Sequence, residues 1–532
     1  MSQHHSELSV KTAKLGRLLR QVKAARSGRP DPWPAHPALY ELNTWTWLRR
    51  LGMDAGHPVT LGNVPDEELE RIADRGFDAV WLMGVWLRSR WSRRRARGDA
   101  GLQARCRELL PDGHERDLVG SPYAVAAYRV DPALGGDGEL AALRQRLAGR
   151  GLRLVLDFVP NHLAADHPWV AEHPHRLVRG NREDLSRSPD NWFRHRSGEA
   201  ETVFAHGRDP NYPGWTDTVQ LDYRVGETRT AMERCLLDIA DRCDGVRCDM
   251  AMLPVRSVFQ RTWGGHFDPP EAQFWPRAID AVRRRHPGFL FIGEVYWDME
   301  WELQQQGFDY TYDKRLYDLL LTDDARGARL RLNAEVEFQN RLTRFIENHD
   351  EQRAALAFGP RRLRAAAVVS LTLPGMRLFH DGQLEGRRLK SPVQLGRWPE
   401  EDLDGDLARF YARLTDALRH PVFRLGEWTP LEPQEEWFGN PSCRNIIAHR
   451  WALRGHRRVA VANLSPEPAQ CFLPLQLPGL GGMNWRFEDL LGEAAYHREG
   501  DDLVMRGLYL DLPPYGCHLF DLHHADRPAE DH

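Results

Sequence analysis

Four short segments of the chain each end an apolar run in ionisable side chains. They are residues 157–162, 245–249, 291–294 and 345–350. An apolar run that closes in polar residues is typical of a buried parallel strand whose carboxyl end opens onto a site. Together the segments supply several carboxyl groups. Two such groups can cleave a glycosidic bond, one as a nucleophile and the other as a proton donor and then acceptor.

The immediate neighbours of two carboxyl groups fit these two tasks. Asp249 follows Arg247 by two residues, so both side chains point to the same face of a strand. A guanidinium there keeps the carboxylate ionised and oriented. Glu294 ends an apolar strand and is followed by further apolar and aromatic residues. Desolvation raises the pKa of such a carboxyl group, as a proton donor near neutral pH requires.

Catalytic groups at the ends of several strands predict an α/β fold, a (β/α)₈ TIM barrel. The apolar runs place its eight strands at residues 38–42, 79–83, 152–158, 245–249, 289–294, 308–312, 343–348 and 376–380. Helical patterns occupy residues 65–75, 228–242, 271–285 and 404–418. Periodicity is lost after the third strand, which predicts an irregular insertion. Short β runs at 445–451, 458–464 and 508–522 predict a C-terminal antiparallel β-sandwich.

The four segments resemble, in order and content, the four signature regions of the α-amylase family of glycoside hydrolases (family 13). The resemblance implies that Asp249 is the nucleophile and Glu294 the acid/base. Asp350 matches the third family carboxylate, which holds sugar hydroxyls and favours an oxocarbenium-like transition state. Hydrolysis of α-glucosidic bonds in α-glucans or maltooligosaccharides, with retention of configuration, is the expected reaction.

Further positions match residues that bind substrate in this family. His162 and His349 match two histidines that hydrogen-bond the same sugar, and Arg247 is expected in the same subsite. Tyr123 resembles the tyrosine that stacks on that sugar, although a tyrosine in a core would be equally ordinary. Asp157 matches a residue that supports the site from behind. Four aromatic residues of the insertion could line outer subsites: Trp169, Trp192, Tyr212 and Trp215.

The metal site of the family is only partly matched. Asn161 occupies the position of a calcium ligand, and Asp217 and Asp222 could add oxygens. A Lys-His pair that follows the nucleophile in many α-amylases is missing from residues 250–253. We therefore expect that no cofactor is required and that calcium binds weakly. The missing pair also argues against typical endo-amylase specificity.

The patterns divide the chain of 532 residues into five parts. They are a helical N-terminal extension (1–30), a catalytic barrel (31–162 and 224–425), an inserted B domain (163–223), a C-terminal β-sandwich (426–525) and a tail (526–532). Each boundary falls where the periodicity changes.

The amino-acid composition restricts the classes of molecule that the protein could bind. The net charge of −4 gives no basic balance for nucleic acid, and no apolar run reaches the length of a membrane span. Seven cysteines without a CxxC pair predict free thiols in the cytoplasm, and 18 tryptophans suit a carbohydrate binder. The arginine-rich run 88–97 is expected to be a solvated loop paired with Asp112, Glu115 and Asp117, rather than an anion site. The oligomeric state is not predicted.

Two other functions stay open. A transglycosylase, either a glucanotransferase or a disaccharide-handling enzyme, uses the same residues and differs in how well its acceptor site excludes water. A non-catalytic, amylase-like scaffold usually lacks one of the three carboxylates, and here Asp249, Glu294 and Asp350 are all present. A barrel aldolase or phosphate enzyme needs a Schiff-base lysine or a glycine-rich phosphate loop, and neither is apparent.

Overall fold

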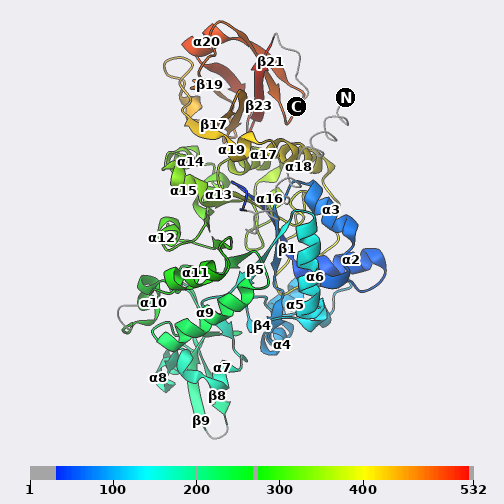
Figure 1. Cartoon of the computed structure of the whole chain (residues 1–532), viewed down its shortest axis with the longest axis vertical. Helices are drawn as coiled ribbons and strands as arrows, with labels where there is room; N and C mark the ends of the chain where they lie inside the picture. Colours follow the sequence, from blue (N-terminus) through cyan, green and yellow to red (C-terminus); the bar gives the residue numbers. More distant parts are fainter. Residues whose placement is uncertain (1–31, 198–199, 268–272, 526–532) are drawn as a thin grey trace.

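The structure is a computed structural model that describes residues 32–197, 200–267 and 273–525 (Figure 1). The predicted N-terminal helical extension (1–30) and the tail (526–532) lie outside the described residues. Within the described ranges, no helix combines the length and the apolar character needed to cross a membrane.

Eight parallel strands close into a barrel, which confirms the predicted fold class. In ring order they are β1 (Ala38–Asn43), β2 (Ala79–Met83), β5 (Arg153–Phe158), β11 (Gly245–Cys248), β12 (Leu290–Gly293), β13 (Tyr310–Tyr312), β14 (Leu342–Arg344) and β15 (Met376–His380). The ring closes between β15 and β1, where Ala38 lies opposite Arg377. Each strand falls within one of the predicted runs or at most one residue beyond it.

Several strands end earlier than predicted. The seventh was expected to reach Asn348, but β14 ends at Arg344. In the same way β11 ends before Asp249 and β12 before Glu294. The apolar run continues past the end of the strand because the next residues are still buried, as Phe345 and Ile346 are after β14. The catalytic candidates therefore lie in loops held by short strands, where their side chains are free to converge.

Helices surround the barrel, and most of them bury one face. They include α2 (Thr44–Ala55), α3 (Asp66–Asp74), α6 (Gly136–Gly149), α9 (Gly226–Ala240), α11 (Phe274–Arg285), α13 (Lys314–Leu321), α17 (Gly359–Leu371) and α18 (Gly405–Leu418). In α6 the buried residues Leu140, Leu143 and Leu147 recur at the spacing of one helix face. Asp404 caps α18 by accepting hydrogen bonds from two backbone N–H groups of its first turn. Three predicted helices, 65–75, 228–242 and 404–418, are confirmed, and the fourth begins partly outside the described residues.

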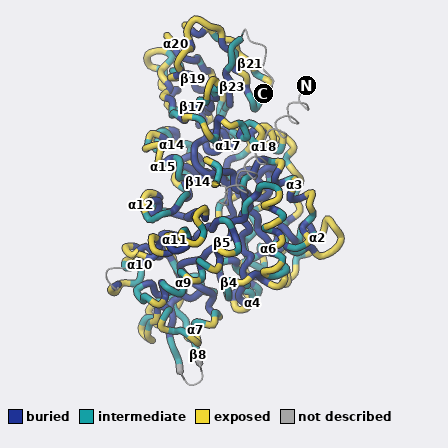
Figure 2. Tube along the Cα trace, in the orientation of Figure 1, coloured by how far each residue is buried: buried dark blue, intermediate teal, exposed yellow. Residues whose placement is uncertain are grey.

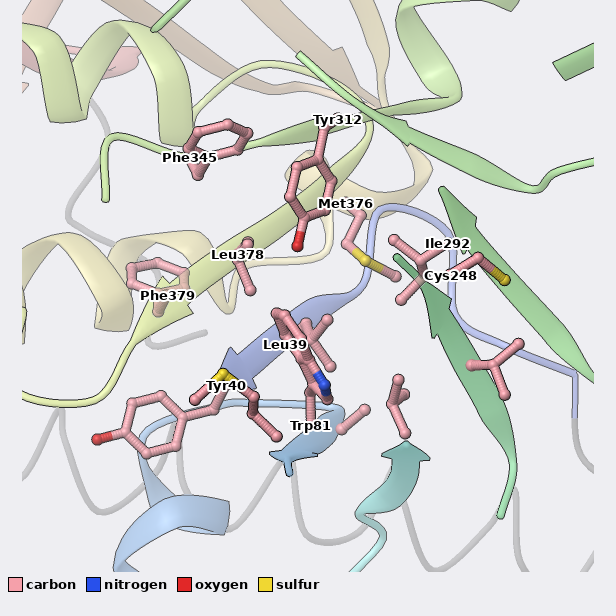
Figure 3. Close-up of a cluster of buried hydrophobic side chains, with 14 of the residues drawn as sticks. Leu39, Tyr40, Trp81, Cys248, Ile292, Tyr312, Phe345, Met376, Leu378 and Phe379 are labelled. Atoms are coloured by element: carbon pink, nitrogen blue, oxygen red, sulfur yellow. The ribbon is translucent and has the colours of Figure 1, made fainter. Parts of the chain in front are cut away.

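The barrel interior is filled by side chains from facing strands. Figure 2 shows buried residues running along the strands, with exposed residues on the outer helices. In Figure 3, Leu39, Trp81, Ile292 and Met376 gather in one cluster, while Tyr40 points away from Leu39. Neighbouring residues on a strand face opposite sides, so Glu41 lies on the same side of β1 as Leu39.

The insertion after β5 has more regular structure than predicted. Strand β6 (His162–Ala164) pairs with β10 (Thr218–Gln220). A three-stranded antiparallel sheet of β7 (Arg179–Gly180), β9 (Ala200–Ala205) and β8 (Trp192–Ser197) projects beside them (Figure 1). The described β8 residues are half-buried or exposed rather than alternately buried, so the sequence carries no clear period of two.

The C-terminal part forms antiparallel sheets over a separate core, as predicted. A six-stranded sheet contains β16 (Glu427–Leu431), β17 (Ile446–Leu453), β18 (His456–Asn463), β23 (Cys517–His524), β20 (Asn484–Asp489) and β21 (Ala495–Glu499). Strand β19 (Ala469–Leu473) pairs with β22 (Leu508–Leu512). The predicted run 508–522 is thus two strands in different sheets, separated by the turn at Pro513–Gly516. The predicted domain boundaries stay a prediction.

The arginine-rich run is not the solvated loop that was expected. Residues Arg90–Gly98 form helix α4, and the Ser89 side chain caps it by accepting a hydrogen bond from the Ser92 backbone N–H. Arg88 is buried and donates to the Gly120 carbonyl. Two of the predicted acidic partners, Asp112 and Asp117, pair with Arg397 instead. The capping serine and good helix formers outweigh the repulsion between the arginines.

Candidate active site

The predicted site residues lie at one end of the barrel, at or just beyond the carboxyl ends of four strands. They are Asp157, Asn161 and His162 at β5, Arg247 and Asp249 at β11, Glu294 at β12, and His349 and Asp350 at β14. Tyr123 reaches the same site from the segment before β4 (Val125–Val130), a strand that pairs with β3 (Trp86–Arg88). The parallel strands bring together segments that lie far apart in the sequence.

Three carboxyl groups converge on one buried guanidinium. Arg247 Nη1 lies 2.7 Å from Asp249 Oδ1, and Nη2 lies 2.6 Å from Glu294 Oε2. Nη2 is also 3.9 Å from Asp350 Oδ2. The guanidinium stands over the rings of Trp81 and Tyr123, 5.2 and 5.4 Å from their centroids. The structure therefore brings all three predicted carboxylates around one fixed positive charge.

Glu294 is held on both oxygens and is almost fully buried. Its Oε2 accepts a hydrogen bond from the Met250 backbone N–H at 2.7 Å, in addition to Arg247. Its Oε1 accepts one from the Tyr296 hydroxyl, also at 2.7 Å. Burial, together with the nearby charges of Asp249 and Asp350, raises the pKa of Glu294 to about 7 against the opposing effect of Arg247. A carboxyl group with this pKa can both give and take a proton near neutral pH.

The loop that carries Asp249 is tied to Glu294 through an unusual backbone conformation. Met250 has a φ of 41°, in the left-handed region that residues other than glycine rarely adopt. The hydrogen bond from Met250 to the Glu294 side chain stabilises it, and the Ala251 N–H donates to the Glu294 carbonyl at 2.9 Å. Burial raises the pKa of Asp249, while Arg247 opposes that shift. Strained backbone of this kind is found at functional sites more often than elsewhere.

Asp350 and His349 form an ion pair at the rim of the site. His349 Nε2 lies 3.0 Å from Asp350 Oδ2 and 2.7 Å from the Tyr123 hydroxyl oxygen. The Tyr123 ring stacks on the His349 ring at 5.5 Å. Enclosure disfavours the ionised form of Asp350, but the charges of His349 and Arg247 hold its pKa well below the ordinary value. Asp350 is therefore an ionised acceptor, and its side chain is 43% exposed.

Two other predicted residues lie deeper or to the side. Asp157 accepts hydrogen bonds from Trp81 Nε1 at 3.0 Å and from the Gly84 N–H at 2.7 Å, and burial raises its pKa. It pairs across the ladder with Arg247, which fits a supporting position. His162 packs against Trp215, and burial lowers its pKa to about 4. Among the described residues, no hydrogen bond or ion pair joins His162 to the three carboxylates.

Glu41 belongs to the site although the sequence motifs did not identify it. It lies on β1, is fully buried, and its Oε1 is 2.5 Å from His349 Nδ1. Burial alone would lower the pKa of His349, but Asp350 and Glu41 raise it to about 10. The available signal was a charged residue inside an apolar buried strand, since a glutamate is almost never fully buried without a partner. Tyr296, the second missed residue, had no comparable signal.

The residues proposed for calcium make hydrogen bonds and an ion pair within the protein. The Gln220 side-chain nitrogen donates to the Asn161 carbonyl at 2.9 Å, to Asn161 Oδ1 at 3.0 Å and to the Leu221 carbonyl at 3.1 Å. Asp222 is paired with Arg224, and Asp217 accepts a hydrogen bond from a serine hydroxyl. Hydrogen-bond donors of the protein therefore lie on oxygens of Asn161, Asp217 and Asp222.

Other parts of the described chain show where metal or sugar could be held. Among described His, Cys, Asp and Glu residues, ligand atoms of three or more residues gather within 4.8 Å of one another only at His173, His175 and Glu227. A hollow of about 360 Å³ lies beside the loop that follows Glu294. Its lining includes Tyr212, Met250, Tyr296, Trp297 and Lys314. Of the four aromatic residues considered for outer subsites, Tyr212 lines this hollow.

Comparison with known proteins agrees with the geometry. Residues 66–390 match the family model described as "Alpha amylase, catalytic domain". The chain is 26% identical over 486 residues to the alpha-amylase MalA of Haloarcula japonica, covering 89% of this chain and 62% of that protein. It is 28% identical over 233 residues to an alpha-1,4-glucan:maltose-1-phosphate maltosyltransferase of Bifidobacterium longum, covering 43% of this chain and 25% of that protein. The chain thus spans less than two thirds of the length of these relatives.

The fold agrees with solved structures as well. A noncanonic maltogenic alpha-amylase, AmyB of Thermotoga neapolitana, superposes with a TM-score of 0.64 at 18% identity, covering 91% of this chain and 98% of that one. At this identity the likeness concerns the arrangement of the barrel and the C-terminal sheets.

Proposed function

The chain belongs to the alpha-amylase family, and from this premise we propose that it cleaves α-glucosidic bonds of α-glucans or maltooligosaccharides with retention of configuration. The observation that carries the proposal is the arrangement of Asp249 and Glu294 on one guanidinium. Neighbouring nitrogens of Arg247 hold the two carboxyl groups side by side. This arrangement suits the separation of about 5–5.5 Å that retaining enzymes use.

In the first step Asp249 attacks the anomeric carbon of the sugar. Its carboxylate forms a bond to that carbon while the bond to the leaving oxygen breaks. Glu294, protonated because burial raises its pKa to about 7, gives its proton to that oxygen. The products of this step are the released alcohol and a glycosyl ester on Asp249.

In the second step Glu294 acts as a base. It takes a proton from a water molecule, whose oxygen attacks the anomeric carbon and displaces Asp249. The sugar is released with its original configuration, and Glu294 is protonated again. Both halves of the reaction use the same carboxyl group, first as a proton donor and then as a proton acceptor, so a pKa near the working pH serves both directions of transfer.

The remaining site residues hold the sugar that is attacked. Asp350, ionised beside His349, accepts hydrogen bonds from two hydroxyl groups and favours a flattened, cationic ring. Tyr123 offers its outer face as a stacking surface. Arg247 orients the nucleophile, and His162 adds a neutral hydrogen-bonding group because its pKa is about 4.

Transfer to a second sugar is the alternative, and one observation favours it. The hollow lined by Tyr212, Tyr296 and Trp297 adjoins Glu294, where an acceptor must lose its proton. Aromatic rings there would hold a sugar acceptor in competition with water. One of the relatives is a maltosyltransferase by name. A scaffold without activity is less well supported, because all three carboxylates meet at Arg247.

A product analysis tests these proposals. Maltooligosaccharides, sucrose, trehalose and isomaltose are incubated with the protein, with and without an added glucose acceptor, and the products are followed over time. Hydrolysis gives shorter sugars whose yield does not depend on the acceptor. Transfer gives longer or mixed sugars whose yield rises with acceptor concentration. Absence of any product from every α-glucoside would remove both functions and leave a binding role.

We further propose that activity needs no calcium and that the protein works in the cytoplasm. The amide of Gln220, which bonds three oxygens at the family's calcium position, supports the first statement. Seven free thiols support the second, because unpaired cysteines are typical of a reducing compartment. Immunoblotting of fractions from the source cells tests the location, and recovery mainly in the membrane or secreted fraction would contradict it.

A further inference from the structure

The contact between Glu41 and His349 joins the first strand of the barrel to the loop after the seventh. The two residues are 308 positions apart in the chain, and Glu41 Oε1 lies 2.5 Å from His349 Nδ1. Glu41 is fully buried and His349 is 5% exposed. Water is thus kept from the contact, which strengthens its electrostatic effect.

Both nitrogens of His349 face acceptors. Nδ1 faces the Glu41 carboxylate, and Nε2 faces Asp350 and the Tyr123 hydroxyl. A neutral imidazole carries one N–H and could satisfy only one side, whereas the imidazolium carries two. The ring is also fixed by Trp81 at 5.6 Å on its edge. The geometry therefore favours the doubly protonated ring.

The charges around His349 come from several elements. The ionisable groups that face it or its partners are Glu41 on β1, Tyr123 before β4, Asp157 on β5, Arg247 on β11, Tyr312 on β13, Asp350 beside it and Lys390, whose charge acts on Asp350. Burial lowers the pKa of His349, but the carboxylates of Asp350 and Glu41 outweigh it and raise that pKa to about 10.

We propose that Glu41 is a positioning residue that keeps His349 as an imidazolium, so that Asp350 stays ionised and oriented for the sugar. The second oxygen of Glu41, Oε2, is buried and has no hydrogen-bond partner in the described part of the chain. A buried carboxylate with one free oxygen is costly for stability, so its retention at this place is explained by its effect on His349. The proposal rests on the proposed function only for the role of Asp350.

The variant Glu41→Gln tests this directly, because it keeps the shape and removes the charge. Histidines labelled with ¹³C in the ring are titrated by NMR, and the His349 signal is identified by its loss in His349→Gln. Loss of one opposite charge at this distance lowers the pKa by about 1–3 units. Glu41→Asp keeps the charge but withdraws it by one methylene, so it lowers the pKa less and serves if the glutamine variant does not fold.

Sugar binding is measured separately from cleavage. Calorimetry gives the Kd of maltotriose in a Glu294→Gln background, where the proton of Glu294 no longer affects the result. In Glu41→Gln we expect Kd to rise about tenfold as the pH is raised from 7 to 9, given a shift of about two units in the pKa of His349. At pH 6 the Kd of this variant should stay within about threefold of the Kd of the parent. The parent should show little change over the same range.

A matched control is available in the same barrel. Glu347 is also fully buried and its Oε1 lies 2.9 Å from His380 Nδ1, but His380 forms no ion pair with Asp350 in the described chain. Glu347→Gln should therefore leave the pH dependence of maltotriose binding unchanged. An unaltered His349 titration in Glu41→Gln, or equal pH dependence in both variants, overturns the proposal. A lowered His349 pKa in a protein that binds no α-glucan supports the contact and overturns the proposed function instead.

Discussion

Two buried clusters of arginines and carboxylates lie in the barrel domain, and their charges balance differently. In the Arg247 cluster one arginine faces three carboxyl groups: Asp249, Glu294 and Asp350. In the Arg344 cluster two arginines face two carboxyl groups: Arg344 and Arg331 with Asp313 and Glu300. Both clusters are largely buried, apart from the Asp350 side chain, which is 43% exposed. Only the first has more acids than bases.

This difference separates a reactive cluster from a supporting one. Where carboxyl groups outnumber cations, they cannot all be ionised at low cost, and one keeps its proton to a higher pH. Glu294 is that group, with a pKa raised to about 7 mainly by burial. Where the charges match, each carboxyl group has an arginine partner and the ion pairs hold the structure in place. The predictions below test this contrast.

The largest effect is expected for Asp249→Asn. It should lower activity by at least about a thousandfold, because the covalent step loses its nucleophile. Arg247 keeps Glu294 as a partner, so the variant should still fold. Peptide mass after inactivation with a 2-deoxy-2-fluoro glycosyl donor should place the label on Asp249. A label on another carboxylate, together with an active Asp249→Asn variant, would contradict the assignment of Asp249 as the nucleophile.

Glu294→Gln should separate donors by their leaving groups. Donors with poor leaving groups need a proton and should lose about a thousandfold in kcat/KM, while activated donors should lose far less. Added azide should partly restore turnover and give a glycosyl azide of retained configuration. Equal losses for both kinds of donor, without rescue by azide, would contradict the role of Glu294.

Asp313→Asn should show the opposite pattern. Asp313 is buried between Arg331 and Arg344, so its loss leaves Arg344 without its carboxylate partner, while Arg331 keeps Glu300. Breaking a buried ion pair on one side costs about 3–5 kcal/mol of stability. Urea unfolding should show this loss, while kcat of the folded protein stays within about threefold of the parent. A variant as stable as the parent but inactive would mean that the two clusters do not differ in kind.

The pH dependence follows from the raised pKa of Glu294. The proton donor is lost as pH rises through about 7, so kcat on unactivated donors should fall about tenfold per pH unit above that value. The folded state also keeps this proton to higher pH than the unfolded state. The associated stability is therefore present at acidic pH and lost as pH rises through about 7. A kcat profile that is flat from pH 6 to 9 would refute the assignment.

The smallest effect is expected for removal of calcium. EDTA should leave activity and Tm nearly unchanged, because donors already occupy the oxygens around Gln220. Gln220→Glu replaces the donor by a carboxylate, and its Tm should rise with added calcium; a hundredfold excess over Kd corresponds to about 2.7 kcal/mol. A Tm drop of roughly 5 °C in the parent on chelation, reversed by calcium alone, would show that a site exists after all.

The parts of the fold that repeat a simple pattern could be predicted from the sequence. The barrel strands are continuous apolar runs, and each catalytic carboxyl group lies at or just after the end of one of them. The same sequence pattern therefore predicted both the strands and the catalytic residues. The hairpin of β8 and β9 was missed because neither strand alternates clearly: the described β8 residues are half-buried or exposed, while Val203, Phe204 and Ala205 of β9 are all buried. The helix at Arg90–Gly98 was missed because its many charges hid a good capping serine.

Contacts between distant segments could not be predicted in the same way. Glu41 is an isolated charge in a strand until β1 is placed beside the loop after β14. The amide of Gln220 has no special neighbours in sequence, and its role depends on Asn161, 59 residues earlier. Such contacts depend on closure of the barrel rather than on local propensity.

The pairing of β1 with β15, which closes the barrel, can form only late in synthesis of the chain. Strand β1 leaves the ribosome before β15, so Ala38 is synthesised before Arg377, the residue that it will lie opposite. At about 5–20 residues per second this interval lasts roughly 15–70 s. During that time β1 lacks the partner on one side, and such an open edge can pair with other chains. A nascent chain that already contains Asp249 and Glu294 is therefore still inactive, and its yield in the cell depends on protection of that edge until the ring closes.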